Sequence, residues 1–175
     1  MNRPKLVLTG AVLLVALGCG GGSGSGPSGP PASSLAYTPP TDLTGWRLVQ
    51  DSASSTGTHL VLDLLAPSGL SGQGVTLTLT GDASRATCSL LAGGAYANPL
   101  VRIASPSGSA LRTVVAQAPG SPIVYGANPV LSFALDLTAN ATTGTITLTV
   151  TQAGHLDAFN MTAPITVQAG TVQVN

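Results

Sequence analysis

The sequence predicts an all-β domain, an antiparallel β-sandwich of many short strands. Two segments, residues 75–80 and 145–151, alternate between apolar residues and Thr. Since successive side chains of a strand point to opposite faces, each segment has one face for a core and one for water. Short connections rich in Gly, Pro, Ser and Asn separate the apolar segments, and amphipathic helical periodicity is absent. These three observations together define the fold class.

The expected strands are justified in chain order by their alternate apolar residues. The clearest strands span residues 60–64, 75–80, 131–137, 145–151 and 172–174. Their expected core faces carry Leu60, Leu62, Leu64, Val75, Leu77, Leu79, Leu131, Phe133, Leu135, Leu137, Ile146, Leu148, Val150, Val172 and Val174. Weaker strand signals lie at residues 46–50, 100–104, 112–117, 123–125 and 165–167. Residues 83–91 are left open, because they could also hold a helical turn.

The first 18 residues are predicted to be a signal peptide. Arg3 and Lys5 precede an apolar run at residues 6–17, and a run of about a dozen residues is typical of a signal peptide. A membrane-spanning helix needs about 20 apolar residues, so this run is too short to be a permanent anchor.

The end of this segment resembles the lipobox of bacterial lipoproteins. Gly18 and Cys19 match the pattern, whereas Ala16 and Leu17 stand in the reverse of its usual order. The resemblance implies that Cys19 is lipidated and holds the protein to a membrane. Because Gly20, rather than Asp, follows the cysteine, it also implies the outer membrane. The alternative is an ordinary exported protein in which Cys19 is incidental.

A tether and one domain follow the signal. Residues 19–34 are the lipidated cysteine and a Gly/Ser/Pro string without large apolar side chains, which predicts disorder. A flexible chain of this length spans on the order of 20 Å. Residues 35–175 then form the β-sandwich domain, which is long enough to bury a core.

Charge is scarce, at 7% of the chain. Beyond Cys19 the charged residues are four Arg and six Asp, so there is no basic patch for nucleic acid. Cys88 is the other cysteine of the chain. We interpret it as a small buried residue rather than as half of a bridge between two chains.

From Thr58 to Val174 the order of strands and turns resembles a cohesin-like domain, a β-sandwich class related to bacterial carbohydrate-binding modules. The resemblance is carried by residues 59–65, 74–79, the Asp-containing turn at 81–84, and the segments 129–137, 144–148 and 170–174. A Tyr often found near the end of the strand before that turn is replaced here by Thr80. The resemblance implies a nine-stranded jelly-roll sandwich and a binding role. It assigns no contact residue, because the contact face varies among cohesins.

The titratable residues do not form a recognisable catalytic pattern. His59 and His155 are interpreted as surface or strand-end residues, with His155 in a loop, and no nucleophile elbow accompanies them. Asp63 and Asp136 point away from the expected core and are interpreted as solvated rather than as an acid/base pair. We therefore predict no enzyme activity.

The sequence also predicts no cofactor. Two scattered histidines and Cys88 do not supply a zinc site. Residues 157–160 are the nearest approach to a calcium loop, and an ordinary turn is the simpler interpretation.

Two surfaces remain as candidates for binding. Sugar recognition would use exposed aromatic rings, for which Trp46, Tyr96 and Tyr125 are the candidates, with Trp46 favoured as a core residue. The Thr-rich faces of residues 75–80 and 145–151 would form an uncharged docking surface if the strands were adjacent. Solvent-facing Thr is also common in ordinary strands.

These observations favour a non-catalytic, lipid-anchored envelope protein whose β-sandwich binds a protein partner. The first alternative is a carbohydrate-binding lipoprotein, and the second is a structural envelope protein without a discrete ligand. Exposed aromatic residues gathered on one face would favour sugar binding. An exposed apolar patch or a long unpaired strand edge would favour protein docking.

Overall fold

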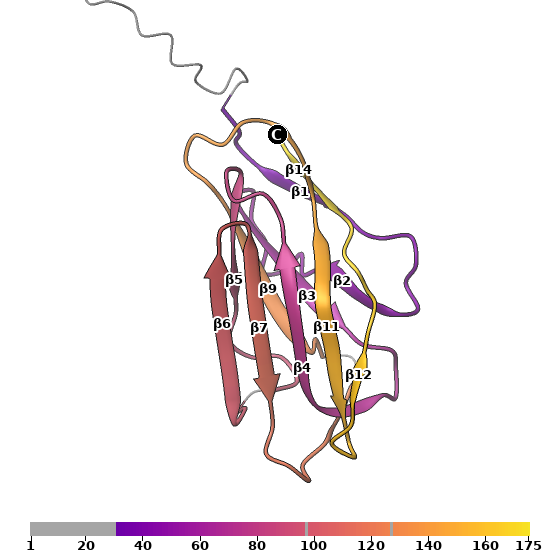
Figure 1. Cartoon of the computed structure of the whole chain (residues 1–175). Coiled ribbons are helices and arrows are strands. Elements are labelled where there is room, and N and C mark those ends of the chain that lie inside the picture. The colour runs from indigo at the N-terminus through magenta and orange to yellow at the C-terminus, as the bar shows by residue number, and fades with distance from the viewer. Residues whose placement is uncertain (1–30, 97, 127) are drawn as a thin grey trace, which may run out of the picture.

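The computed structural model describes residues 31–96, 98–126 and 128–175. The described residues form strands and connections, and none of their elements is a helix long and apolar enough to cross a membrane. Figure 1 shows two sheets stacked face to face, with a small third sheet at one end. The predicted antiparallel β-sandwich is confirmed. The segment predicted to be a signal peptide, and Cys19, lie outside the described residues.

The front sheet has the strand order β12–β11–β4–β7–β6, and β8 pairs with the start of β4. All of its pairings are antiparallel. Its strands are β4 (Ser71–Thr80), β6 (Val101–Ser107), β7 (Ala110–Ala116), β8 (Ile123–Val124), β11 (Thr149–Asp157) and β12 (Thr162–Pro164).

The rear sheet has the order β13–β2–β3–β9–β5 and is antiparallel except for β13 beside β2. Its strands are β2 (Trp46–Gln50), β3 (His59–Leu65), β5 (Ala86–Leu90), β9 (Leu131–Leu137) and β13 (Val167–Gln168). Residues 83–91 thus contain a strand at the edge of this sheet, and a single turn closed by the amides of Arg85 and Ala86 on the Asp82 carbonyl precedes it.

The end sheet consists of β1 (Leu35–Thr38), β14 (Thr171–Val174) and β10 (Gly144–Thr147), in that order. It lies where the described chain begins and where the C-terminus ends, at the top of Figure 1. We call this end the entry pole. The opposite end, the distal pole, holds the described parts of the connections that follow β3, β5, β7 and β11, namely residues 66–70, 91–96, 98–100, 117–126 (which include β8), 128–130 and 158–161.

The core lies between the front and rear sheets, and alternate residues of each strand fill it. Twelve of the residues predicted to face it are at most 2% exposed: Leu60, Leu62, Leu64, Val75, Leu77, Leu79, Leu131, Phe133, Leu135, Ile146, Val172 and Val174. The period-two pattern therefore predicted the buried faces as well as the strands. Leu137, at the end of β9, is only half-buried.

The main departure from the predicted strands is at Leu148. Residues 145–151 alternate without interruption, yet they form two strands, β10 in the end sheet and β11 in the front sheet. The chain changes sheets at Leu148, which remains buried at 5% exposure. Because the alternation continues through the switch, both strands keep an apolar face toward the interior.

The ordered domain begins earlier than residue 35. The amide of Ala32 donates to the carbonyl of Ala141 over 2.7 Å, and that of Ser34 donates to the carbonyl of Asn175 over 3.0 Å. Pro31 forms a bridge with Thr142. The last four residues assigned to the tether, 31–34, are therefore attached to the sandwich.

Candidate functional site

The aromatic residues considered as sugar contacts lie in the core. Trp46, Tyr96 and Tyr125 are 6%, 0% and 2% exposed. The Tyr96 and Tyr125 hydroxyls form a hydrogen bond, and the Trp46 and Tyr125 rings pack edge to face with centroids 5.7 Å apart. A ring binds a sugar through an exposed face. In this structure the three rings have no such face, and they fill the space between the sheets.

His155 belongs to the same buried cluster. The prediction from the sequence that it lies in a loop is wrong. It lies in β11 at 4% exposure, with its ring centroid 5.5 Å from that of Trp46 and 5.7 Å from that of Tyr125. Among the described residues its Nε2 has no hydrogen-bond partner. Burial lowers the pKa of His155 below its ordinary value of 6.5, so the neutral ring is favoured near pH 7.

A glycine makes room for this cluster. A Cβ at Gly72 would overlap Nε2 of His155 and would lie 2.5 Å from the Tyr125 hydroxyl oxygen. Real side chains do not approach so closely, so only glycine fits beside these two rings at this point of β4.

The outer face of the rear sheet is polar, and its groups are paired. His59 Nδ1 lies 2.6 Å from Oδ1 of Asp136, and the Ser132 hydroxyl donates to Asp63 over 2.6 Å. Burial raises the pKa of the Asp63 carboxyl, and the Ser132 hydrogen bond opposes the rise. His59 begins β3 and is half-exposed, which confirms its interpretation as a strand-end residue. Asp63 and Asp136 point away from the core, as predicted, and each binds its own neighbour.

Residues 157–160 form a closed turn after β11. The Asp157 carboxylate accepts the amides of Phe159 and Met161 over 2.8 and 2.9 Å. No group of three His, Cys, Asp or Glu side chains in the described part of the chain is placed to hold a metal ion. The carboxylate considered as a calcium ligand thus closes the turn.

Cys88 lies on β5 opposite Leu135, in the rear sheet. It is half-buried and lines an apolar pocket of about 100 Å³ near the entry pole, together with Leu79, Ile146 and Leu148. Burial raises the pKa of its thiol to about 12. A thiol that stays protonated is a poor nucleophile, which agrees with the interpretation of Cys88 as a small buried residue.

The predicted rows of Thr meet on the outer face of the front sheet, but only in part. Thr78 and Thr80 of β4 lie opposite Thr151 and Thr149 of β11. Thr145 belongs to the end sheet and does not join them. A bulge follows in β11, where Gln152 adopts a positive φ of 49° and accepts a hydrogen bond from Thr78 over 3.1 Å.

Beyond the bulge this outer face is hollowed into a shallow groove. Gly74 of β4 and Gly154 of β11 form its floor, because neither carries a side chain. A Cβ at Gly74 would lie 2.9 Å from the Val115 carbonyl oxygen, and one at Gly154 would lie 3.3 Å from Cγ2 of Thr76. The groove has a volume of about 140 Å³ and is lined by Gly74, Val75, Thr76, Val114, Val115, Ala116, Gly154, Leu156 and Thr162.

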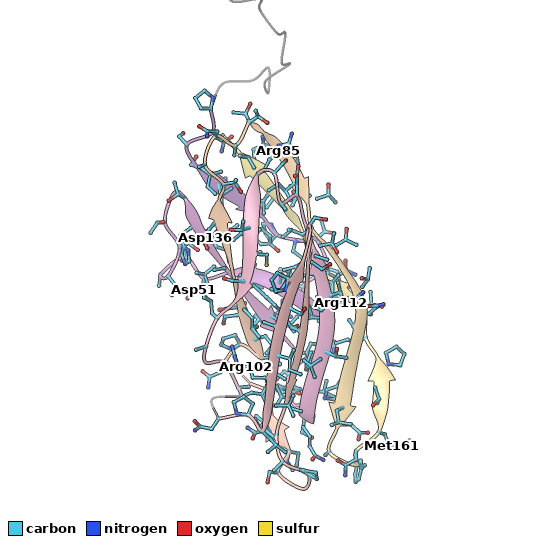
Figure 2. All side chains as sticks on the ribbon, turned by 60° about the vertical axis from the view of Figure 1, so that its left-hand side comes forward. Asp51, Arg85, Arg102, Arg112, Asp136 and Met161 are labelled. Carbon is cyan, nitrogen blue, oxygen red and sulfur yellow. The ribbon has the colours of Figure 1, made fainter. Side chains whose placement is uncertain are left out.

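Two large apolar side chains stand at the rim of the groove. Ile103 of β6 lies opposite Val114 of β7, and they are 53% and 38% exposed. Among the described strand residues that point outward from the front sheet, Arg112 alone is charged. Figure 2 shows Arg112 on the side of the molecule opposite to Asp51 and Asp136. The two outer faces thus differ: that of the rear sheet carries paired charges, and that of the front sheet carries rows of Thr, one Arg and an apolar groove.

Sequence reasoning missed this groove. Ile103 and Val114 lie within two of the weaker predicted strands, and nothing in one sequence shows that they become neighbours. Gly74 and Gly154 were the available signal, because glycine inside a strand often marks a close approach or a hollow.

The front sheet also has an exposed edge strand, β6, but two features of this edge oppose pairing with a further strand. Arg102 lies opposite the buried Val115, so its side chain points inward, and its Nη2 is buried without a partner among the described residues. Pro106 lacks an amide hydrogen. Inward-pointing charges and prolines are typical devices against the addition of a further strand. The face of the sheet, rather than its edge, is the open surface.

Comparison with solved structures places this architecture among the cohesins. The sixth cohesin of scaffoldin B from Acetivibrio cellulolyticus, solved in complex with a Cel5 dockerin, is 17% identical with a TM-score of 0.53, over 72% of this chain and 96% of that chain. A type II cohesin domain from the cellulosome of the same organism is 12% identical with a TM-score of 0.52, over 75% and 94%. The second type II cohesin of its adaptor scaffoldin is 9% identical with a TM-score of 0.51, over 81% and 96%.

This likeness shows that the chain has the cohesin fold, a β-sandwich, as the resemblance in sequence order implied. No protein-family model matches the chain, and no curated protein matches it.

Proposed function

We propose that this protein is a non-catalytic docking module that binds a protein partner on the outer face of its front sheet. The observation that carries the proposal is the uncharged groove between Gly74 and Gly154, with Ile103 and Val114 exposed at its rim. Exposed apolar surface of this kind marks an interaction site, because its contact with water is unfavourable in free energy and a partner that covers it removes that contact. The partner is a protein that presents an apolar side chain to the groove.

The fold supports a docking role. One structure of the same fold was solved in complex with a dockerin, so this type of sandwich is compatible with protein docking. The carbohydrate alternative is less well supported, because Trp46, Tyr96 and Tyr125 are buried. A structural role without a ligand does not explain why an apolar groove is open to solvent while the neighbouring edge strand, β6, is protected against pairing.

The proposal includes a lipid anchor on Cys19. The described chain enters the sandwich beside the end sheet. An anchor on the N-terminal side therefore holds the entry pole toward the membrane. The groove, on the side of the sandwich, then remains open to a partner. Several acyl chains on one cysteine hold a protein stably at a membrane, whereas one chain does so only marginally.

Replacing Ile103 by Asp should abolish docking without unfolding the domain. The side chain is 53% exposed, and exposed substitutions change stability by less than about 0.5 kcal/mol. A carboxylate at the rim of an apolar interface would lose its water on binding, so we expect partner capture to fall by about tenfold or more. The measurement is capture from solubilised envelope extract by the full chain tagged after Asn175, with bound proteins quantified by mass spectrometry.

Leu43→Asp is the matched control. Leu43 is 55% exposed but lies in the connection between β1 and β2, away from the front sheet. A protein captured by the parent chain and by Leu43→Asp, but not by Ile103→Asp, supports docking at the groove. Equal capture by all three chains would refute it.

Replacing Cys19 by Ala should release the protein from the membrane. Without a thiol at this position there is no acceptor for the lipid, and the described residues contain no helix that could replace it. Fractionation of cells should move essentially all of the protein from the membrane to the soluble exported fraction. Ser23→Ala, within the same Gly/Ser string, is the control and should stay with the membrane. Retention of Cys19→Ala in the membrane would contradict the anchor.

A further inference from the structure

The distal pole concentrates the exposed apolar side chains of the molecule. Among the described residues, the four most exposed large hydrophobic side chains are Phe159 at 84%, Val124 at 71%, Leu100 at 68% and Met161 at 65%. All four lie in or beside the connections of this pole. The other phenylalanine of the chain, Phe133, is fully buried. Figure 2 places Met161 at the lower end of the molecule, far from Arg85 near the top.

The connections of this pole carry no charged residue, and the charge beside them, Asp157 at the end of β11, has its carboxylate bound to the amides of Phe159 and Met161. The connections at residues 66–70, 91–100, 117–130 and 158–161 contain no Asp, Glu, Lys, Arg or His. Asp82, Arg85 and Asp51, in contrast, lie in connections nearer the entry pole. A surface without charges can be removed from water at little electrostatic penalty. This end of the sandwich is therefore suited to burial against another apolar surface.

The turn that carries Phe159 and Met161 is held in one conformation. The Asp157 carboxylate accepts both of their amides, and Asn160 adopts the left-handed region with φ of 62°. Gln73, fully buried, donates its side-chain amide to the carbonyl of Ala158 over 2.9 Å. The side-chain oxygen of Gln73, Oε1, accepts a hydrogen bond from the amide of Gly120 over 2.9 Å. Gln73 thus joins this turn to the connection after β7. Two large apolar side chains thus project from a turn whose main chain is held by hydrogen bonds. Little main-chain conformational entropy is therefore lost when a partner buries them.

We propose that Phe159 and Met161 form a knob that inserts into an apolar pocket of the protein partner docked on the groove. The proposal rests on the docking function given above. Met161 directly precedes Thr162, which lines the groove, and Leu156 on the other side of the turn lines it too. The knob and the groove are therefore continuous, and one partner can cover both.

A protein pocket fits this surface better than a lipid bilayer does. The knob lies at the pole opposite the entry of the chain, so an anchor on the N-terminal side directs it away from the membrane. No Lys or Arg stands in the distal connections to contact anionic lipid headgroups. The rim of the partner pocket is expected to be uncharged as well, because an unpaired charge facing these connections would be buried without compensation.

The test compares four variants of the full chain tagged after Asn175, which lies at the entry pole. The knob variant is Phe159→Ser with Met161→Ser, the groove variant is Ile103→Asp, and the control is Leu43→Asp. The probe is solubilised envelope extract, and captured proteins are quantified by mass spectrometry. We expect the knob variant to lower capture of the groove-dependent protein by about tenfold or more, because central apolar anchors dominate binding energies. Phe159→Leu should keep most of the capture, since it preserves an apolar side chain.

The outcomes separate the two proposals. Full capture by the knob variant, with loss in the groove variant, would overturn the knob and leave the docking function intact. Full capture by both variants would overturn the knob and the docking function together. All variants should melt as the parent does, because the substituted side chains are exposed.

A second measurement addresses lipid. The unlipidated Cys19→Ala chain is sedimented with vesicles of phosphatidylcholine, with and without the knob substitutions. We expect no binding in either case. Vesicle binding that is lost with the knob would assign Phe159 and Met161 to the membrane and overturn the protein pocket.

Discussion

Replacing Leu79 by Asp should prevent the domain from folding. Leu79 is 1% exposed on the central strand of the front sheet, and its neighbours across the strands are Leu111 of β7 and Val150 of β11. A carboxylate there would be surrounded by apolar side chains without a partner, which costs several kcal/mol. Domains of this size are stable by only about 5–15 kcal/mol, so one such charge removes much or all of the stability. Circular dichroism and a thermal melt would show loss of the cooperative transition.

Thr80→Asp is the control for this prediction. Thr80 is the next residue of the same strand, is half-buried and points to the outer face, opposite Thr149. The same charge at this position keeps access to water, so the melting curve should stay close to that of the parent. A normal melt for Leu79→Asp would mean that the faces of β4 are reversed.

Replacing Gly72 by Ala should destabilise the domain more than any other single methyl addition described above. The new Cβ would overlap His155 Nε2 and lie 2.5 Å from the Tyr125 hydroxyl oxygen. Both groups belong to buried rings, packed against Trp46 on their other sides, so they have no room to move away. Overpacking of a core typically costs about 1–3 kcal/mol, and displacing the Tyr96–Tyr125 hydrogen bond adds to that. Urea unfolding should show a lower midpoint with an unchanged slope.

Two comparisons test the cause of this effect. A Cβ at Gly45 meets no atom within 4 Å, so Gly45→Ala should unfold at the parent midpoint. In a chain that also carries His155→Ala, the ring is gone, and Gly72→Ala should cost less than in the parent background. Equal costs in the two backgrounds would exclude crowding against His155 as the reason.

The sequence predicted the strands because their signal is local. Alternation in β3, β4 and β9 reports which side chains face the core, and the structure buries those side chains. The change of sheet at Leu148 left no such signal, because the alternation of residues 145–151 is the same whichever neighbours the strand has. What a strand pairs with is decided by distant segments and not by its own residues.

The candidate site was harder to predict for the same reason. Ile103 and Val114 become neighbours only through the pairing of β6 with β7, and Gly74 and Gly154 only through that of β4 with β11. The aromatic residues led to the opposite error: they were considered as exposed sugar contacts, but they are buried. Tyr96 and Tyr125 stand among Gly, Asn and Pro, which is typical of exposed loops, yet these connections fold inward and place the two hydroxyls in contact.

The end sheet has a mechanical consequence. A pull on the N-terminal side of the chain reaches the sandwich at residues 31–34 and then β1, whose four residues pair with β14 from Leu35 opposite Val174 to Thr38 opposite Thr171. Such a pull runs along the strand, so it loads all four pairs together in shear rather than opening them one at a time. β14 is held on its other side by β10, which continues through Leu148 into β11 of the front sheet. Tension between an anchored N-terminus and a partner on the front sheet is thus shared by several strands before any one of them can detach.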